Sequence, residues 1–284
     1  MRGTCDACRN QRSCAECGKP VAYFDHVGVR ASSGSRLGSG IWHVASPCGH
    51  AQKPRVKTAA GPGLAVYNGG PLWQSAFRWQ NVYWGTYWHG KAPAISPAEV
   101  DLAVNDIEAN RSYSGGLSEY NVRQGAALPS KAIADDPPST MDDSQVGPKI
   151  KAWIQSGLVP DLGQQGAYNI FLPPGTSVTL GGSASCQSFC DYHNFDGNHF
   201  YTVEPYPCTA GCNQCTPSAF DTLTMGLSEE MTELKTDMNP GTGWVIGNEE
   251  LCDYCDASFV CRKVSTGEYV NAWYSNARRA CWAP

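Results

Sequence analysis

The chain lacks three features that would assign it to a broad functional class. It has no run of about 18 apolar residues, so we expect no membrane span. It has no Lys/Arg run, and its formal net charge of -5 makes a nucleic-acid partner unexpected. No Gly-x-Ser-x-Gly, Walker or dinucleotide-binding motif occurs in the required context, which leaves nucleotide-dependent chemistry without support.

Charged residues are also scarce, at 17%, whereas cysteine is abundant. Fourteen cysteines in 284 residues indicate disulfides formed in an oxidising compartment, so we expect a secreted, extracellular protein. The first residues, Met1 to Cys8, do not show the basic and apolar segments of a signal peptide. Asn110-Arg-Ser112 is a sequon for N-glycosylation and gives weak support to the same location.

The N-terminal part of the chain differs in composition from the rest. Residues 1–62 hold a cysteine cluster and a Ser/Gly-rich stretch, and we interpret them as an extension of a main domain at 63–284. Two Cys-x-x-Cys pairs have zinc-knuckle spacing and Cys48-Gly-His50 offers further ligands, but disulfides are the competing interpretation. The paired cysteines are Cys5, Cys8, Cys14 and Cys17.

The main domain contains nine further cysteines, which we expect to connect its loops by disulfides. Nine is an odd number, so one of them must pair with the N-terminal set or stay reduced. These disulfide candidates are Cys186, Cys190, Cys208, Cys212, Cys215, Cys252, Cys255, Cys261 and Cys281.

Periodicity in the main domain predicts both strands and helices. Strands are expected at 81–88, 168–172 and 199–203, where aromatic and β-branched residues end at Gly or Pro. Ser96-Pro-Ala-Glu99 has the form of a capping box and predicts a helix to about Asn110. A second helix is predicted over 143–157, with Gly157 as its C-cap. This order indicates an α/β or α+β domain with helices packed on a mixed sheet.

Aromatic residues crowd the first of these strands. In a continuous strand Trp84 and Trp88 would share one face, while Tyr83 and Tyr87 would share the other. One face could stack on the sugar rings of an extracellular polysaccharide, although burial in the core is the commoner use of large aromatic residues.

Several segments, taken in order, are similar to the EXORDIUM-like (phosphate-induced protein) family of plants and bacteria. They lie within about 69–282 and include Asn81-Val-Tyr-Trp-Gly-Thr-Tyr-Trp88, Tyr168-Asn-Ile-Phe-Leu-Pro-Pro-Gly175 and Glu250-Leu-Cys-Asp-Tyr-Cys255. The resemblance implies an extracellular protein, linked in plants to cell expansion and growth signalling. It carries no securely assigned chemistry.

The same resemblance singles out the acidic segment 227–237. Family members usually show Ser-His-Glu-x-x-Glu-x-x-Thr-Asp here, which is similar to the His-Glu-x-x-His helix of zinc peptidases. In this chain Glu229 stands at the histidine position, while Glu230, Glu233 and Asp237 keep the pattern. A downstream Glu/Asp pair is matched by Glu250 and Asp253. The resemblance therefore implies a zincin-like core with a degenerate site.

The spacing of these acids predicts a cation site. On a helix Glu229, Glu233 and Asp237 form a stripe of like charges, which a bound cation would stabilise. Oxygen ligands favour a hard divalent ion over zinc, and His193 or His199 is a candidate for a nitrogen ligand. Glu230, beside the stripe, is the candidate general base. The alternative is a solvated acidic face partly neutralised by Lys235.

These observations favour a secreted protein whose acidic site, including Glu250 and Asp253, binds one divalent cation and is catalytically weak or inactive. Calcium, manganese and zinc are the candidate ions. The first alternative is an active metal-dependent hydrolase of the peptidase type. The second is an extracellular structural or adhesive subunit that self-assembles through its Cys-rich N-terminus and aromatic strand, with a polysaccharide or a protein as partner.

Overall fold

The computed structural model describes residues 63–284 except 76, 91–92, 209–211, 213–215, 217 and 257–260. The N-terminal hypotheses lie outside the described residues, as does the disulfide candidate Cys215. The undescribed N-terminal candidates are Cys5, Cys8, Cys14, Cys17, Cys48 and His50.

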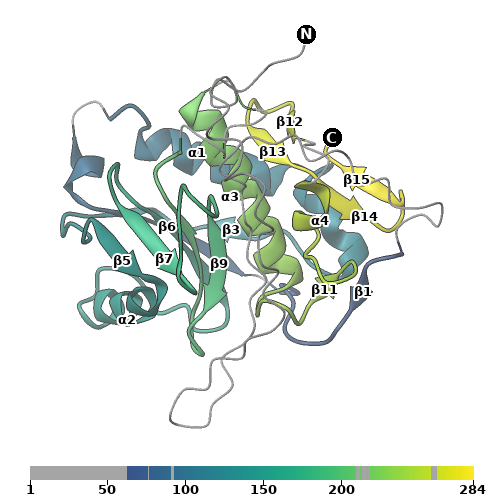
Figure 1. Ribbon diagram of the computed structural model, residues 1–284, viewed down its shortest axis with the longest axis horizontal. Coiled ribbons are helices and arrows are strands. Elements are labelled where there is room, and N and C mark those ends of the chain that lie inside the picture. The colour runs from purple at the N-terminus through teal and green to yellow at the C-terminus, as the bar shows by residue number, and fades with distance from the viewer. Residues whose placement is uncertain are drawn as a thin grey trace, which may run out of the picture.

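A mixed sheet of six strands forms the centre of the molecule (Figure 1). Its main order is β3-β2-β6-β10-β9, and β4 also pairs with β2. All neighbours are parallel except β9, which runs antiparallel to β10 at one edge. The bounds are β2 Arg78–Trp84, β3 Ala126–Ala127, β4 Lys131–Ile133, β6 Gly166–Phe171, β9 Tyr192–Phe195 and β10 Phe200–Glu204.

Each face of this sheet has its own core, because successive side chains along a strand point to opposite faces. One core contains Tyr83 and Phe171 and is covered by α1 (Pro97–Ala109) and α3 (Ala219–Thr236). The other contains Val82 and Ile170 and is covered by α2 (Val146–Gln155). A small sheet beside α2 consists of β5 Thr140–Asp142, β7 Ser177–Leu180 and β8 Ser183–Ala184.

The C-terminal part of the chain packs on the far side of α3, so that this helix lies between the central sheet and a set of short hairpins (Figure 1). The hairpins pair β12 (Cys261–Lys263) with β13 (Tyr269–Asn271), and β14 (Trp273–Ser275) with β15 (Ala280–Trp282). Further elements are β1 Val66–Tyr67, which pairs with β11 Trp244–Val245, and the short α4 Asp253–Asp256. None of the described helices is both long and apolar enough to cross a bilayer.

Most predicted elements are confirmed. The capping box is formed as expected, since Ser96 Oγ accepts the Glu99 N–H and the Glu99 carboxylate accepts the Ser96 N–H. The second helix starts at Val146 after a 3-10 turn at Asp143–Gln145. It ends before Gly157, whose φ of 74° gives the left-handed conformation of a glycine stop signal. The other two predicted strands correspond to β6 and β10.

The predicted strand 81–88 is wrong in its second half. Strand β2 ends at Trp84 because Gly85 takes a φ of 117°, and residues Thr86–His89 form a 3-10 turn. Trp84 packs edge-on against Trp153 in one core, whereas Trp88 contacts Tyr83 in the other. Both tryptophans are buried, which confirms their use in packing and removes them as a platform for polysaccharide or for self-assembly.

Three disulfides are present among the described residues: Cys186–Cys208, Cys190–Cys212 and Cys255–Cys281. Cys261 is also disulfide-bonded. The prediction is wrong for Cys252, which is the reduced cysteine that the odd number allowed. Its side chain is fully buried in the core on the α3 side of the sheet.

A buried ion pair fixes α3 to α1. Lys235 is 1% exposed, and its Nζ lies 2.7 Å from Glu108 Oε2 and 2.7 Å from Ser114 Oγ. Burial raises the pKa of Glu108, but Lys235 and several hydrogen bonds outweigh burial and leave that pKa lowered. The idea that Lys235 neutralises a solvated acidic face is therefore wrong.

Replacing Lys235 by Met should destabilise the protein by about 3–5 kcal/mol, because Glu108 is left as a buried charge without its partner. The matched control is Lys149→Met, which removes a surface pair with the 61% exposed side chain of Asp135 and should cost about 0–1 kcal/mol. Urea denaturation measures both. Equal effects of the two substitutions would contradict a buried role for the Lys235 charge.

Candidate metal centre

The acidic segment lies on α3 and is buried rather than solvated. Glu229, Glu230 and Glu233 are 5%, 4% and 2% exposed. The reason is the position of the helix, which packs against β9 and β10 on one side and against β13 on the other. Helical spacing thus places the predicted stripe in the interior, where charged carboxylates are costly unless something compensates them.

The edge strands bring an imidazole to this helix. His193 on β9 pairs in register with Thr202 on β10, and both are buried. Strand alternation puts Asp191 on the His193 side and Glu204 on the Thr202 side of the same face. A Cβ on Gly226 of α3 would lie 1.7 Å from Asp191 Oδ2, so the helix approaches the strand closely at a glycine.

Two of these acids, Asp191 and Glu204, were not selected from the sequence. Both are electrostatically coupled to Glu230, and Asp191 lines the cavity described below. The signal that would have found them is the period of two in Asp191-x-His193 and Thr202-x-Glu204, which puts each acid on the same strand face as a residue beside the site.

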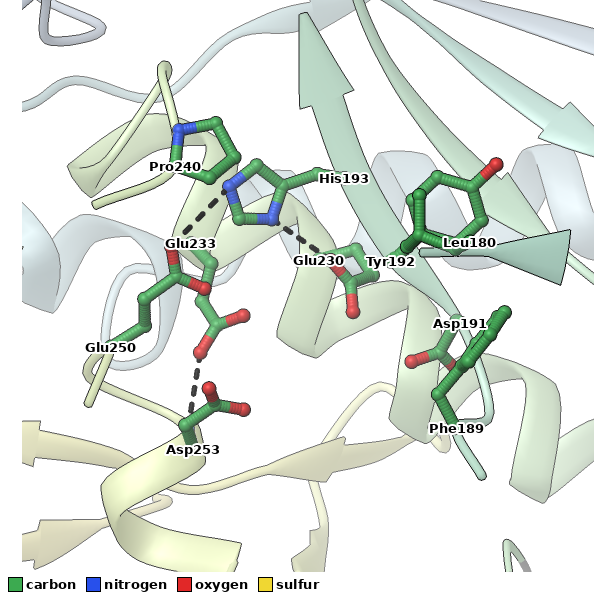
Figure 2. Close-up of a pocket in the computed structure, with 10 residues that line it drawn as sticks. All are labelled: Leu180, Phe189, Asp191, Tyr192, His193, Glu230, Glu233, Pro240, Glu250 and Asp253. Carbon is green, nitrogen blue, oxygen red and sulfur yellow. Dashed lines mark hydrogen bonds and ion pairs between the residues drawn. The ribbon is translucent and has the colours of Figure 1, made fainter. Parts of the chain in front are cut away.

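Three side chains form the first group that could hold a metal ion. His193 Nδ1 lies 3.0 Å from Glu230 Oε2, and ligand atoms of His193, Glu230 and Glu233 all lie within 4.8 Å of one another. We call this set the histidine triad. Figure 2 shows its members converging from β9 and α3.

A second group shares one member with the first. Ligand atoms of Glu229, Glu233 and Asp253 also lie within 4.8 Å of one another. We call this set the carboxylate triad. It joins α3 to the start of α4, so the downstream acid Asp253 reaches the helix that the sequence analysis singled out.

The backbone selects the tautomer of His193. Its Nε2 lies 3.1 Å from the carbonyl oxygen of Asp237, which can only accept a hydrogen bond. The proton must therefore be on Nε2, and the lone pair of Nδ1 faces Glu230. A backbone carbonyl on the far nitrogen is the arrangement that orients metal-binding histidines in proteins.

Asp237 has a different place from the one predicted. Its carboxylate accepts the backbone N–H groups of Gly241, Thr242 and Gly243 at 2.7, 3.0 and 2.7 Å. A Cβ on Gly243 would lie 2.1 Å from Thr236 O, so this tight loop requires glycine. The structure does not bring the Asp237 carboxylate into either triad, and Asp237 instead fixes the carbonyl that holds His193.

Glu233 belongs to both triads. Its Oε1 accepts the N–H groups of Cys252 and Asp253 at 3.1 and 3.0 Å, which holds the start of α4 against α3.

Three further residues predicted from the sequence belong to neither triad: Glu250, His199 and Asn110. Glu250 nevertheless lines the cavity described below, and its Oε1 lies 3.6 Å from His193 Nε2. His199 is absent from both triads and instead contacts Asp161 and Asp196. Asn110 follows α1, where its Oδ1 accepts the N–H groups of Ser112 and Tyr113. Its glycosylation remains a prediction.

Burial controls the protonation of the centre. Burial and the neighbouring carboxylates, Asp191 first, raise the pKa of Glu230 well above its ordinary value. Burial and then Asp253 and Asp237 raise the pKa of Glu250 in the same way. Burial lowers the pKa of His193. The proton between Glu230 and His193 therefore resides on Glu230, which donates it to Nδ1, and a bound cation would take its place.

A small cavity opens among these side chains, lined by both acids and apolar residues (Figure 2). Its interior of about 20 Å³ has room for one or two water-sized occupants. A metal ion fits this space. The lining comprises Leu180, Phe189, Asp191, Tyr192, His193, Glu230, Glu233, Pro240, Glu250 and Asp253.

No protein-family model, characterised protein or solved structure matches this chain. The centre is therefore interpreted from its own geometry and from the chemistry of its donor atoms.

Replacing Gly226 by Ala should destabilise the protein by about 1–3 kcal/mol, because the new methyl group collides with the Asp191 carboxylate. In an Asp191→Ala background the same substitution should stabilise the helix by up to about 1 kcal/mol. Urea denaturation of the four proteins in this cycle measures the difference. An equal effect in both backgrounds would show that Asp191 does not lie against the helix.

The tautomer of His193 can be observed directly by ¹⁵N NMR of the imidazole. Because burial lowers its pKa, His193 should remain neutral at pH 6.5, where an ordinary histidine is about half protonated. The proton should be on Nε2. The urea-unfolded protein supplies the reference spectrum, and an imidazolium signal at pH 7 would refute this assignment of the proton.

Proposed function

We propose that this chain is an extracellular, EXORDIUM-like protein that binds a divalent cation in the cavity between β9, α3 and the start of α4, and that it is catalytically weak or inactive. The carrying observation is the histidine triad. His193, Glu230 and Glu233 converge within 4.8 Å, are buried, and include an imidazole whose other nitrogen is held by a backbone carbonyl.

Charge supports a cation rather than a purely structural cluster. Six carboxylates of the centre and its surroundings are buried: Glu204, Glu229, Glu230, Glu233, Asp237 and Glu250. The sequence of α3 contains one basic residue, Lys235, and that residue pairs with Glu108. A divalent ion would allow the carboxylates to ionise without the cost of uncompensated buried charge.

The donor set indicates which ion fits. One imidazole nitrogen with carboxylate oxygens suits manganese or zinc, because imidazole is a good ligand for transition metals. Calcium prefers 6–8 oxygen ligands and would use the carboxylates around Glu250 and Asp253 instead. Manganese accepts both kinds of donor and is therefore the best probe.

The same geometry supports weak or absent hydrolysis. Glu229 stands where the related zinc-peptidase pattern has an imidazole ligand. Glu230 donates to His193, so in the cation-free protein it holds a proton rather than acting as a base.

A zincin-like core is part of the proposal. Its support is a helix carrying Glu229-Glu230-x-x-Glu233 packed against a mixed sheet with an antiparallel edge strand, and a downstream pair, Glu250 and Asp253, that reaches the same cavity. Family membership is supported by the order of the matching segments. An extracellular location is supported by the three disulfides, which persist in oxidising compartments.

The full-length protein, freed of metal with a chelator, should bind Mn²⁺ in a calorimetric titration. Glu233→Gln should weaken binding by more than the roughly 10- to 100-fold that loss of an outer partner costs, because it removes the charge shared by both triads. His199→Gln is the matched control, since His199 belongs to neither triad, and it should bind as the parent does.

Two results would contradict the proposal. A folded, metal-free protein that takes up no Mn²⁺, Ca²⁺ or Zn²⁺ would remove the cation site. Turnover of a peptide library by the metal-loaded protein, abolished in Glu230→Gln, would instead show an active hydrolase.

A further inference from the structure

A line of buried polar side chains crosses the face of the central sheet that α1 and α3 cover. Asn81 of β2 pairs in register with Asn169 of β6, and Asn169 pairs with Thr202 of β10. We call these three residues the polar row. Thr202 in turn pairs in register with His193 of the histidine triad. All four residues are buried, from 0% to 4% exposed. The polar row therefore crosses three strands and ends beside the candidate metal centre.

Hydrogen bonds run along the polar row in one direction. They start at Asp101 of α1, whose Oδ1 accepts the side-chain N–H of Asn81 at 2.8 Å. Asn81 Oδ1 accepts from the Asn169 amide at 2.9 Å, and Asn169 Oδ1 accepts from the Thr202 hydroxyl at 3.3 Å. Because an ionised carboxylate can only accept, Asp101 determines which way each amide is turned. The Thr202 hydroxyl consequently points toward β6 and away from His193.

Asp101 is held independently of the polar row. Its Oδ1 also accepts the Tyr83 hydroxyl at 2.7 Å, and its Oδ2 accepts the Ser130 hydroxyl at 2.5 Å. These bonds connect α1 to β2 and to the residue that precedes β4. The chain of hydrogen bonds thus has a fixed starting point on the helix.

His193 lies directly beside Thr202 on the neighbouring strand. The backbone N–H of Asp196 donates to His199 O, so these two residues form a hydrogen-bonded pair at the end of the antiparallel β9–β10 ladder. Hydrogen-bonded pairs alternate with pairs that are not hydrogen-bonded, in which the side chains lie closer together. His193 and Thr202, three positions further along each strand, are a pair of the closer kind. The imidazole therefore meets the side of Thr202 that carries no hydroxyl.

Stability alone does not explain the polar row. Two positions earlier on the same strands, the register partners Trp79, Ala167 and Phe200 form an apolar line in the same core. Replacing hydrogen-bonded partners by apolar groups of the same shape can be nearly neutral. What the polar row adds is register, because parallel strands have no tight turns to fix their pairing. A slip of two residues would keep every side chain on its face but place amides against apolar side chains.

We propose that the polar row and its Asp101 anchor position His193 for the cation. They hold β10 in register with the sheet, and β10 holds the edge strand β9 at the level where the imidazole meets Glu230. The Asp237 carbonyl orients the far nitrogen of the ring, whereas the polar row sets the height of the ring along the sheet. This inference rests on the proposed function, because a cation is what the position of His193 serves.

The test replaces the polar row by apolar residues of the same shape in the full-length protein. This apolar-row variant combines Asn81→Leu, Asn169→Leu and Thr202→Val, so that no amide or hydroxyl of the row stays buried without a partner. Calorimetry should show Mn²⁺ binding weakened by about 10- to 100-fold, the usual cost of losing a residue that orients a metal ligand. In the metal-free variant, ¹⁵N NMR of His193 should show loss of the hydrogen bond between Nδ1 and Glu230.

Single substitutions isolate the contribution of the Thr202 hydroxyl. Thr202→Val leaves Asn169 Oδ1 without its donor and should weaken Mn²⁺ binding by about 10-fold or more. Thr202→Ser keeps the hydroxyl and should bind as the parent does. The matched control is Thr179→Val on β7, whose hydroxyl bonds to Met141 O outside the polar row, and it should also bind as the parent does.

The outcomes separate this inference from the proposed function. Unchanged Mn²⁺ affinity and an unchanged His193 spectrum in the apolar-row and Thr202→Val variants would overturn the positioning role and leave the cation proposal standing. A parent that binds no Mn²⁺ would overturn the proposed function, and the metal-free His193 spectra would then decide the positioning role alone. If the apolar-row variant does not fold, the comparison of Thr202→Val with Thr202→Ser gives the same decision.

Discussion

The contact between His193 Nδ1 and Glu230 Oε2, at 3.0 Å, joins the edge strand of the central sheet to the helix that crosses it. One proton holds the two groups together, and burial determines that the carboxyl keeps it. Through this contact the edge strand, the acidic segment of α3 and the cavity between them meet at one point. A cation that replaced the proton would keep the same geometry and supply more charge.

The charged residues in the C-terminal half of α3 and at its end fall into three sets, and each set has different partners. Lys235 faces α1 and is matched by Glu108. Asp237 ends the helix and is matched by three backbone N–H groups of the following loop. Glu230 and Glu233 line the cavity, and Glu229 belongs to the carboxylate triad that shares Glu233. The first two arrangements neutralise their charges locally, and this leaves the cavity as the place where the helix can accept a cation.

Hydrogen bonds to the backbone hold the donor side chains of the centre in position. The loop around Asp237 fixes the carbonyl that orients His193, and Glu233 Oε1 anchors the start of α4 that delivers Asp253. Gly226 and Gly243 permit the close approaches that these contacts require. A donor set held in this way loses little conformational entropy when an ion binds.

The sequence by itself determined the local elements and the chemistry of the helix. The Ser96 capping box, the glycine stop at Gly157 and the aromatic and β-branched strands act over a few residues, and most of these elements are confirmed. The acidic spacing from Glu229 to Asp237 likewise identified the helix at the centre. Tertiary structure alone decided that the acidic face of this helix is buried and that Asp237 caps a loop. It also decided that His193, rather than His199, lies beside Glu230 and Glu233. It also added Asp191 and Glu204, because the pairing of β9 with β10 and their packing on α3 join residues far apart in the chain.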